Sequence, residues 1–172
     1  MKRKLEQLKW HTGETAKQSQ MLTARQNTRH AIATYLSVVA IAHLMWETLQ
    51  LPLYTIWLNS RTQDIAFAVV HCTAGDIMIA GLSLLATLVV LGARTWPAGR
   101  FVRVIALTLL IGVAYTVFSE WLNTSVRKSW TYSELMPIMP WIGTGLSPLL
   151  QWLVVPALGF AAVKRNRDRT RS

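Results

Sequence analysis

Long apolar stretches alternate with short polar segments along this chain. Four stretches approach the roughly 20 apolar residues that a helix needs to cross a bilayer core of about 30 Å. They cover residues 31–51, 65–91, 101–121 and 148–163. Their apolar positions are not confined to one stripe, as they would be on a surface helix of a soluble protein. The pattern predicts an all-α integral membrane protein, a bundle of four transmembrane helices.

The basic residues are distributed unevenly among the segments that flank these stretches. Of the 18 Lys and Arg residues, 15 lie in the two tails and the middle loop, and three lie in the other two loops. Because Lys and Arg concentrate on the cytoplasmic side of membrane proteins, we expect both termini in the cytoplasm and the chain in the inner, plasma membrane. The net charge of +10 is then a topology signal, and no nucleic-acid partner is expected.

The chain divides into two tails and one membrane domain. Residues 1–30 form a basic cytoplasmic tail, residues 31–163 the transmembrane domain, and residues 164–172 a second basic cytoplasmic tail. The first tail is not expected to be a secretory signal, because the apolar run after it is too long and lacks a cleavage site. Met21 is a candidate start. The expected partners are the lipid bilayer and either a second copy of the chain or another membrane subunit.

The connection between the third and fourth stretches, residues 123–146, is the longest and is partly apolar. A solvated loop would be more polar. We therefore expect it to lie in the outer membrane interface or to fold over the mouth of the bundle.

Polar and ionisable residues gather in the outer halves of the predicted spans, where such groups are costly and are candidates for function. Asp76 lies about 16 Å from the outer end of its helix, near the midplane. His43, Glu47 and Gln50 fall within about 60° of one another on one helix face. We expect the polar faces to converge on a pocket that opens toward the periplasm. The candidate pocket residues are His43, Glu47, Gln50, Asp76, Glu120, Asn123, Glu134 and Gln151.

The preferred function is the binding or handling of a metal ion or another cation in this pocket. The candidate metal ligands are His43, Glu47, His71 and Asp76, since imidazole and carboxylate groups suit Zn, Fe, Mn or Cu(II). His71 and Asp76 lie about 140° apart on an ideal helix, so they share a face only if the helix is distorted near Gly75. Two histidines at similar depth also fit a b-type haem. The candidate cofactors are therefore a transition metal or haem b.

Two alternatives remain. In the first, the protein is a membrane-embedded enzyme in which His43, Glu47 and Asp76 exchange protons with a lipid or isoprenoid substrate. The run from His43 to Glu47 resembles the His/Glu arrangement of sterol-isomerase-type membrane proteins, without a second matching motif, so it implies no residue role. In the second, the protein is a non-catalytic membrane subunit whose polar groups only hydrogen-bond between helices.

Overall fold

Helices make up nearly all the regular structure in the part of the chain that the structure describes. The computed structural model covers the backbone of residues 2–169 and the side chains of Glu14 and of residues 17–169. Within residues 2–169 there is no β-strand, and two isolated bridges are the only sheet-like pairings. The all-α prediction is confirmed. In chain order the elements are α1 (Lys2–Leu49), η1 (Leu51–Leu53), α2 (Ile56–Asn59), α3 (Thr62–Val90), α4 (Phe101–Trp121), η2 (Leu122–Val126) and α5 (Leu146–Arg169).

Four helices are long and apolar enough to cross a membrane, which confirms the prediction of a multi-pass membrane protein at this level. They cover Lys17–Leu49, Thr62–Val90, Phe101–Val126 and Leu146–Arg169. The predicted ranges 65–91 and 101–121 agree with α3 and α4 to within a few residues. The fourth helix extends beyond the predicted range 148–163 at both ends. At its C-terminal end the additional residues are mostly basic, and Lys and Arg favour helix although they are not apolar.

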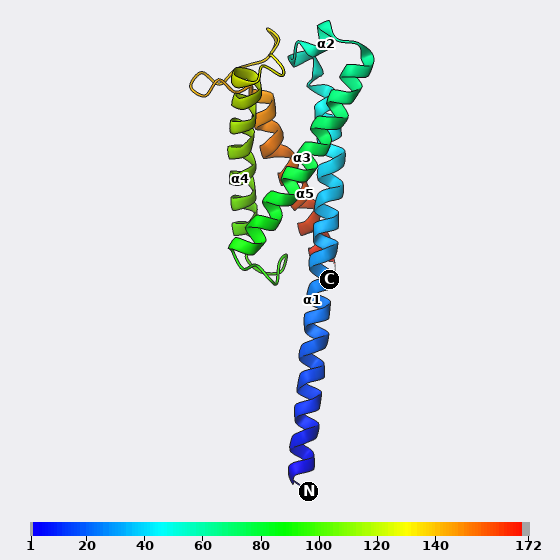
Figure 1. Ribbon diagram of the computed structural model, residues 1–172. Helices are drawn as coiled ribbons and strands as arrows, with labels where there is room; N and C mark the ends of the chain where they lie inside the picture. Colours follow the sequence, from blue (N-terminus) through cyan, green and yellow to red (C-terminus); the bar gives the residue numbers. More distant parts are fainter. Residues whose placement is uncertain (1, 170–172) are drawn as a thin grey trace.

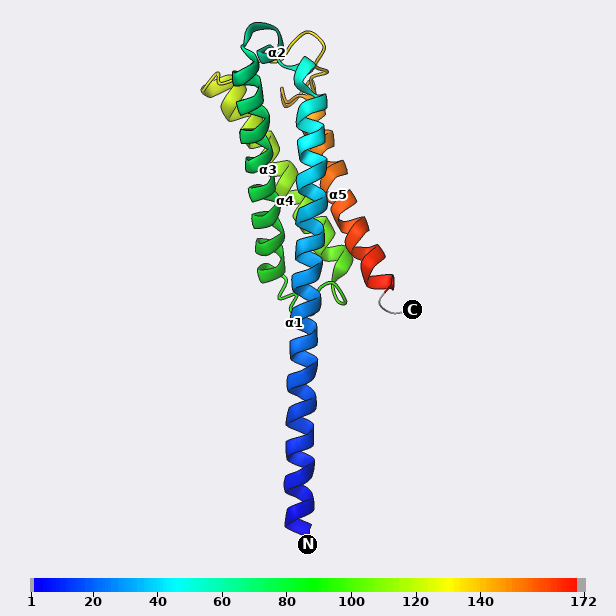
Figure 2. The same cartoon turned by 90° about the vertical axis from the view of Figure 1, so that its right-hand side faces the viewer.

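The polar segment before the first apolar stretch is helical, which the apolar pattern did not predict. Helix α1 continues over 48 residues, and its first half projects away from the other helices (Figures 1 and 2). Its sequence is rich in Lys, Gln, Arg, Ala and Glu, all good helix formers. Helix α1 ends at Leu49, shortly before Pro52, because proline disfavours the α conformation of the residue before it.

The four long helices lie side by side, with α1 and α4 each packed against both α3 and α5 (Figures 1 and 2). We call the end that carries the α3–α4 loop the inner end, and the opposite end, with η1, α2 and η2, the outer end. Near the inner end the rings of Tyr35 and Phe160 pack together in a tilted arrangement, with ring centroids 4.7 Å apart. A Cβ on Gly159 would lie 2.7 Å from the Tyr35 ring. The missing side chain therefore lets α1 and α5 approach closely.

The segment between η2 and α5 lies across the outer end of the helices and is anchored to the α1–α3 connection. The backbone N–H of Thr55 donates to Thr131 O (3.0 Å), and the Ser133 N–H donates to Leu53 O (2.9 Å). The Ser133 hydroxyl also donates to Pro52 O (2.9 Å). These bonds hold the residues that follow Arg127 beside the pocket described next.

Candidate functional site: an acidic pocket at the outer end

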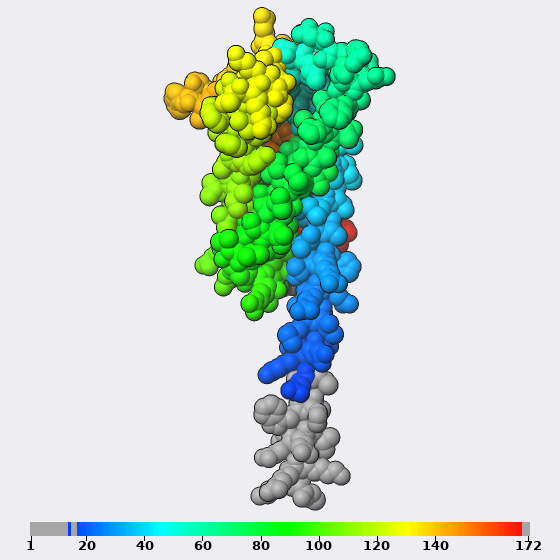
Figure 3. Space-filling view, in the orientation of Figure 1, coloured from blue at the N-terminus to red at the C-terminus, as the bar shows by residue number. Residues whose placement is uncertain are grey.

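A pocket of about 550 Å³ lies among the outer halves of all four long helices. Along α3 its lining extends from Asp64 to Ile79, about 22 Å of helix at the usual rise. Along α4 it extends from Tyr115 to Glu120 and continues to Asn123 in η2, and Gln151 lies on the α5 wall. Figure 3 shows the hollow between α3 and the outer end of α4, with atoms of α5 visible at its bottom.

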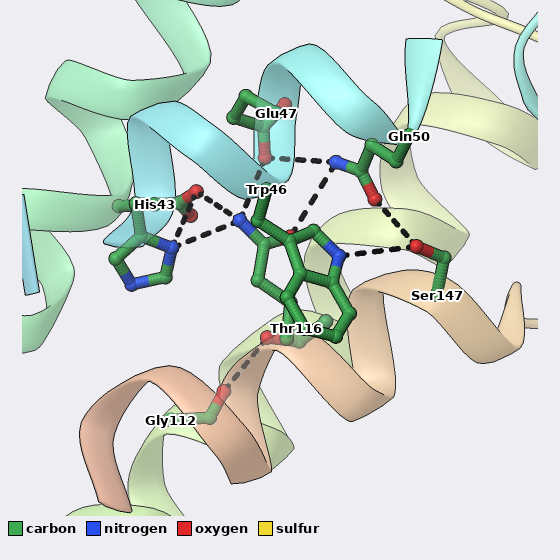
Figure 4. A network of polar contacts seen from close by, with 9 residues as sticks. His43, Trp46, Glu47, Gln50, Gly112, Thr116 and Ser147 are labelled. Atoms are coloured by element: carbon green, nitrogen blue, oxygen red, sulfur yellow. Dashed lines mark hydrogen bonds and ion pairs between the residues drawn. The ribbon is translucent and has the colours of Figure 1, made fainter. Parts of the chain in front are cut away.

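The side-chain amide of Gln151 joins three ionisable groups at the polar floor. Figure 4 shows the polar contacts around His43, Glu47, Gln50 and Ser147. The Nε2 atom of Gln151 is 2.8 Å from Glu47 Oε1 on α1 and 3.1 Å from Asp76 Oδ2 on α3. The same nitrogen is 2.8 Å from His43 Nδ1. Gln151 is buried on α5. Three helices therefore meet at this point: α1 and α3 contribute the ionisable groups, and α5 contributes the amide donor. This convergence follows from the helical spacing of His43 and Glu47, one turn apart on α1.

Donors and acceptors are closely matched in this cluster. An amide nitrogen has two N–H bonds, whereas three possible acceptor atoms face Gln151 Nε2. His43 Nδ1 is also 3.2 Å from Asp76 Oδ2, so a hydrogen on Nδ1 supplies a further donor. The carboxyl groups of Glu47 and Asp76, which come from two different helices, make the floor of the pocket acidic.

The polar floor continues outward from Glu47 toward the start of α5. Gln50 Nε2 donates to Glu47 Oε1 (2.8 Å), and the Ser147 hydroxyl donates to Gln50 Oε1 (2.8 Å). The indole N–H of Trp46 donates to the Ser147 oxygen (3.1 Å). Helix α5 begins at Leu146, and the Ser147 side chain joins α5 to α1.

His43 lies behind the pocket rather than on its wall. Its side chain is 0% exposed and is absent from the pocket lining. One face of the ring packs against Trp152, with ring centroids 5.4 Å apart. Nδ1 faces Asp76 and Gln151, while Nε2 is buried without a hydrogen-bond partner among the described residues. The imidazole therefore positions Asp76 and does not itself reach a molecule in the pocket.

A second acidic point lies nearer the mouth. Glu120 on α4 is buried and accepts a hydrogen bond from the Tyr132 hydroxyl. That hydroxyl in turn accepts one from the Gly145 N–H (3.0 Å). Burial and then the bond to Glu120 raise the pKa of Tyr132 above its usual range, so the phenol stays protonated and remains a donor. The contact holds the loop against the outer end of α4.

The structure brings most of the predicted pocket residues together. Six of them line the pocket, and Glu134 lies apart from it, exposed on the loop. Of the predicted metal ligands, His71 lines the pocket from an exposed position and stacks on Phe67, with ring centroids 5.5 Å apart. The six lining residues are Glu47, Gln50, Asp76, Glu120, Asn123 and Gln151.

The described residues do not offer a ready metal centre. Among them, no group of three or more His, Cys, Asp and Glu side chains is placed to hold a metal ion. A haem between His43 and His71 fits no better, because the His43 ring is enclosed and its Nδ1 is engaged with Asp76 and Gln151.

Several lining residues were not predicted from the sequence. Tyr54, Trp130 and Trp152 form aromatic parts of the wall. Tyr54 and Trp130 lie outside the long helices, where periodicity gives no facing. Trp152 follows Gln151 directly, so on an ideal helix its facing lies about 100° from that of Gln151.

Comparison with protein-family models, with curated proteins and with solved structures finds no match for this chain.

Proposed function

We propose that the chain is a four-helix inner-membrane protein with both termini in the cytoplasm and that its periplasm-facing pocket binds an organic cation. The cation would place an ammonium group at the carboxyl pair of Glu47 and Asp76. The observation that carries this proposal is the Gln151-centred cluster, which places two carboxyl groups at the floor of a 550 Å³ pocket. The orientation rests on the distribution of Lys and Arg.

The composition of the pocket wall supports an organic cation over a bare ion. Four carboxyl groups line the pocket, and Arg127 is the only Lys or Arg among the described lining residues. Aromatic rings make up a further part of the wall and attract ammonium groups through their π faces. A small metal ion would use none of this aromatic surface. The aromatic lining residues are Tyr54, Phe67, Tyr115, Trp130 and Trp152.

Calorimetric titration of detergent-purified protein with benzylammonium tests the proposal, with benzyl alcohol as a neutral probe of similar shape. We expect benzylammonium to bind and benzyl alcohol not to bind. Asp76→Asn and Glu47→Gln should each weaken binding about 10- to 100-fold, as expected for losing a hydrogen bond to a charged group. Affinity should also fall as the pH is lowered, because protonated carboxyl groups no longer attract an ammonium group.

The matched control is Glu134→Gln, which removes an exposed carboxylate outside the pocket and should leave the affinity unchanged. Equal affinity for wild type and Asp76→Asn would overturn the proposal. Elemental analysis of the same sample gives a second way to reject it. A metal that is present in stoichiometric amount in the wild type and is lost in His43→Ala would show that the ligand is a metal ion and not an organic cation.

The second candidate is an enzyme that carries out acid–base chemistry on a lipid or isoprenoid. The observation that favours it is the 3.2 Å contact between His43 Nδ1 and Asp76 Oδ2, because an imidazole behind a carboxyl group can orient it for proton transfer. Incubation of the purified protein with membrane lipids in deuterated water distinguishes the two. Deuterium incorporation into one lipid species, lost in Asp76→Asn, would favour the enzyme.

A further inference from the structure

We propose that the natural occupant of the pocket is a membrane lipid whose head group carries an ammonium and that it enters sideways between α3 and α4. This inference rests on the proposed cation site and adds the class of ligand and its route. The ammonium would lie at Glu47 and Asp76, and the hydrocarbon part would extend through the gap between the two helices into the outer leaflet.

The two helices separate where the pocket is. Helices α3 and α4 approach each other near their connecting loop and diverge toward the outer end (Figure 1). In the space-filling view the divergence leaves a hollow through which α5 is visible (Figure 3). Its α3 side reaches inward as far as Asp76 and Ile79, residues well inside the span Thr62–Val90. The opening therefore faces the side of the helices that a bilayer would cover, not only the aqueous end.

The borders of this opening are apolar and exposed. Phe67 on α3 and Tyr115 on α4 line the pocket, yet they are 70% and 43% exposed. A residue that is both lining and exposed lies at the edge, where it contacts the contents of the pocket and the surroundings. In a membrane those surroundings are acyl chains, so the edge offers a continuous apolar path from lipid to pocket.

The charges match a lipid whose head group carries an ammonium. The acidic floor attracts the ammonium, and Glu120 supplies another carboxyl group closer to the mouth. Arg127, the one Lys or Arg among the described lining residues, lies directly after η2 at the outer mouth and is exposed, so it leaves the acidic floor without a competing cation. An anionic lipid without an amine would place negative charge against three carboxyl groups: Glu47, Asp76 and Glu120.

Cys72 allows the occupancy of the pocket to be measured, because it is the only cysteine in the sequence and is half-buried in the pocket lining. The protein is placed in dodecyl maltoside micelles, whose head group carries no charge, with either phosphatidylethanolamine or phosphatidylglycerol added, and maleimide labelling of Cys72 is timed. We expect phosphatidylethanolamine to slow labelling, about tenfold at a lipid level ten times its Kd, and phosphatidylglycerol to have no effect. The protection should be lost in Asp76→Asn.

A pair of tryptophan substitutions tests the route. Ala68 lines the pocket and is half-buried, whereas Ala66 is exposed and outside the lining. Ala68→Trp should narrow the opening and abolish the binding of phosphatidylethanolamine detected by native mass spectrometry. Ala66→Trp should leave that binding intact. Both variants should keep the wild-type melting temperature in detergent, which checks folding.

Benzylammonium separates this inference from the proposed function. If benzylammonium protects Cys72 in the wild type and phosphatidylethanolamine does not, the cation site stands and the lipid ligand is wrong. If phosphatidylethanolamine binds equally to the wild type and to Ala68→Trp, the lateral route is wrong. If neither probe protects Cys72, both proposals are overturned.

Discussion

At the scale of single residues, Gln151 explains how three ionisable side chains can coexist in the interior. Its amide faces His43, Glu47 and Asp76 at 2.8–3.1 Å, so one side chain of α5 contacts all three groups. Helical spacing predicted these four side chains for one pocket, because residues one turn apart share a face. Spacing could not predict that His43 lies behind Asp76. The angle at which a residue leaves its helix does not reveal which residues of the neighbouring helices will cover its side chain.

Replacing Gln151 by glutamate keeps the shape of the side chain and removes its two N–H donors. We expect Gln151→Glu to lower the free energy of unfolding by about 1–3 kcal/mol near neutral pH, the usual cost of unsatisfied buried polar groups. The loss should shrink as the pH falls, because the introduced carboxyl group, once protonated, again donates one hydrogen bond and no longer repels Glu47 and Asp76. Melting temperatures in detergent at several pH values measure the effect.

Gln63→Glu is the control, since Gln63 lies exposed on α3, and it should change the melting temperature little at any pH. A deficit in Gln151→Glu that does not depend on pH would contradict the interpretation that Gln151 acts as the shared donor.

At the scale of helices, apolar length predicted where the chain can cross a membrane but not where each helix begins. The first predicted span starts at residue 31, whereas α1 already begins at Lys2, because polar helix formers extend a helix without adding hydrophobicity. The segment after η2 is partly apolar, and it was predicted to lie in the outer membrane interface or to fold over the mouth of the bundle. Its anchoring through Thr131 and Ser133 was not predictable, because irregular backbone has no period.

Gly112 on α4 determines how closely α4 approaches α5. A Cβ at this position would overlap the indole ring of Trp152, and Trp152 packs on the His43 ring behind Asp76. We expect Gly112→Ala to cost about 1–3 kcal/mol of stability through overpacking and to weaken benzylammonium binding by displacing His43. Thermal unfolding in detergent and calorimetry measure the two effects.

Gly75→Ala provides the matched comparison for stability, because nothing lies within 4 Å of a Cβ at Gly75. Alanine there should be neutral or stabilising by up to about 1 kcal/mol, given its higher helix propensity. Equal melting temperatures for Gly112→Ala and Gly75→Ala would show that Trp152 moves away without cost.

At the scale of the whole molecule, the two ends of the helices differ in chemistry. Near the inner end Trp96 and Phe160 are buried in an apolar core, and the loop that contains Trp96 accepts a hydrogen bond from Thr28 on α1 (2.6 Å). The outer end holds the ionisable pocket. An apolar inner half gives the membrane domain its stability, and this allows the outer half to hold polar groups that cost free energy to bury.

The orientation of the molecule in the membrane decides on which side this pocket opens. The two basic tails and the loop with Arg94, Arg100 and Arg103 lie at the inner end, which should therefore face the cytoplasm. A reporter that is active only in the periplasm should be inactive when fused after Ser172 and active when inserted between Asn59 and Ser60. The insertion site separates α2 from α3, so it tests the outer end in the same protein. The opposite pair of results would place the pocket on the cytoplasmic side, where a ligand of the outer leaflet could not reach it.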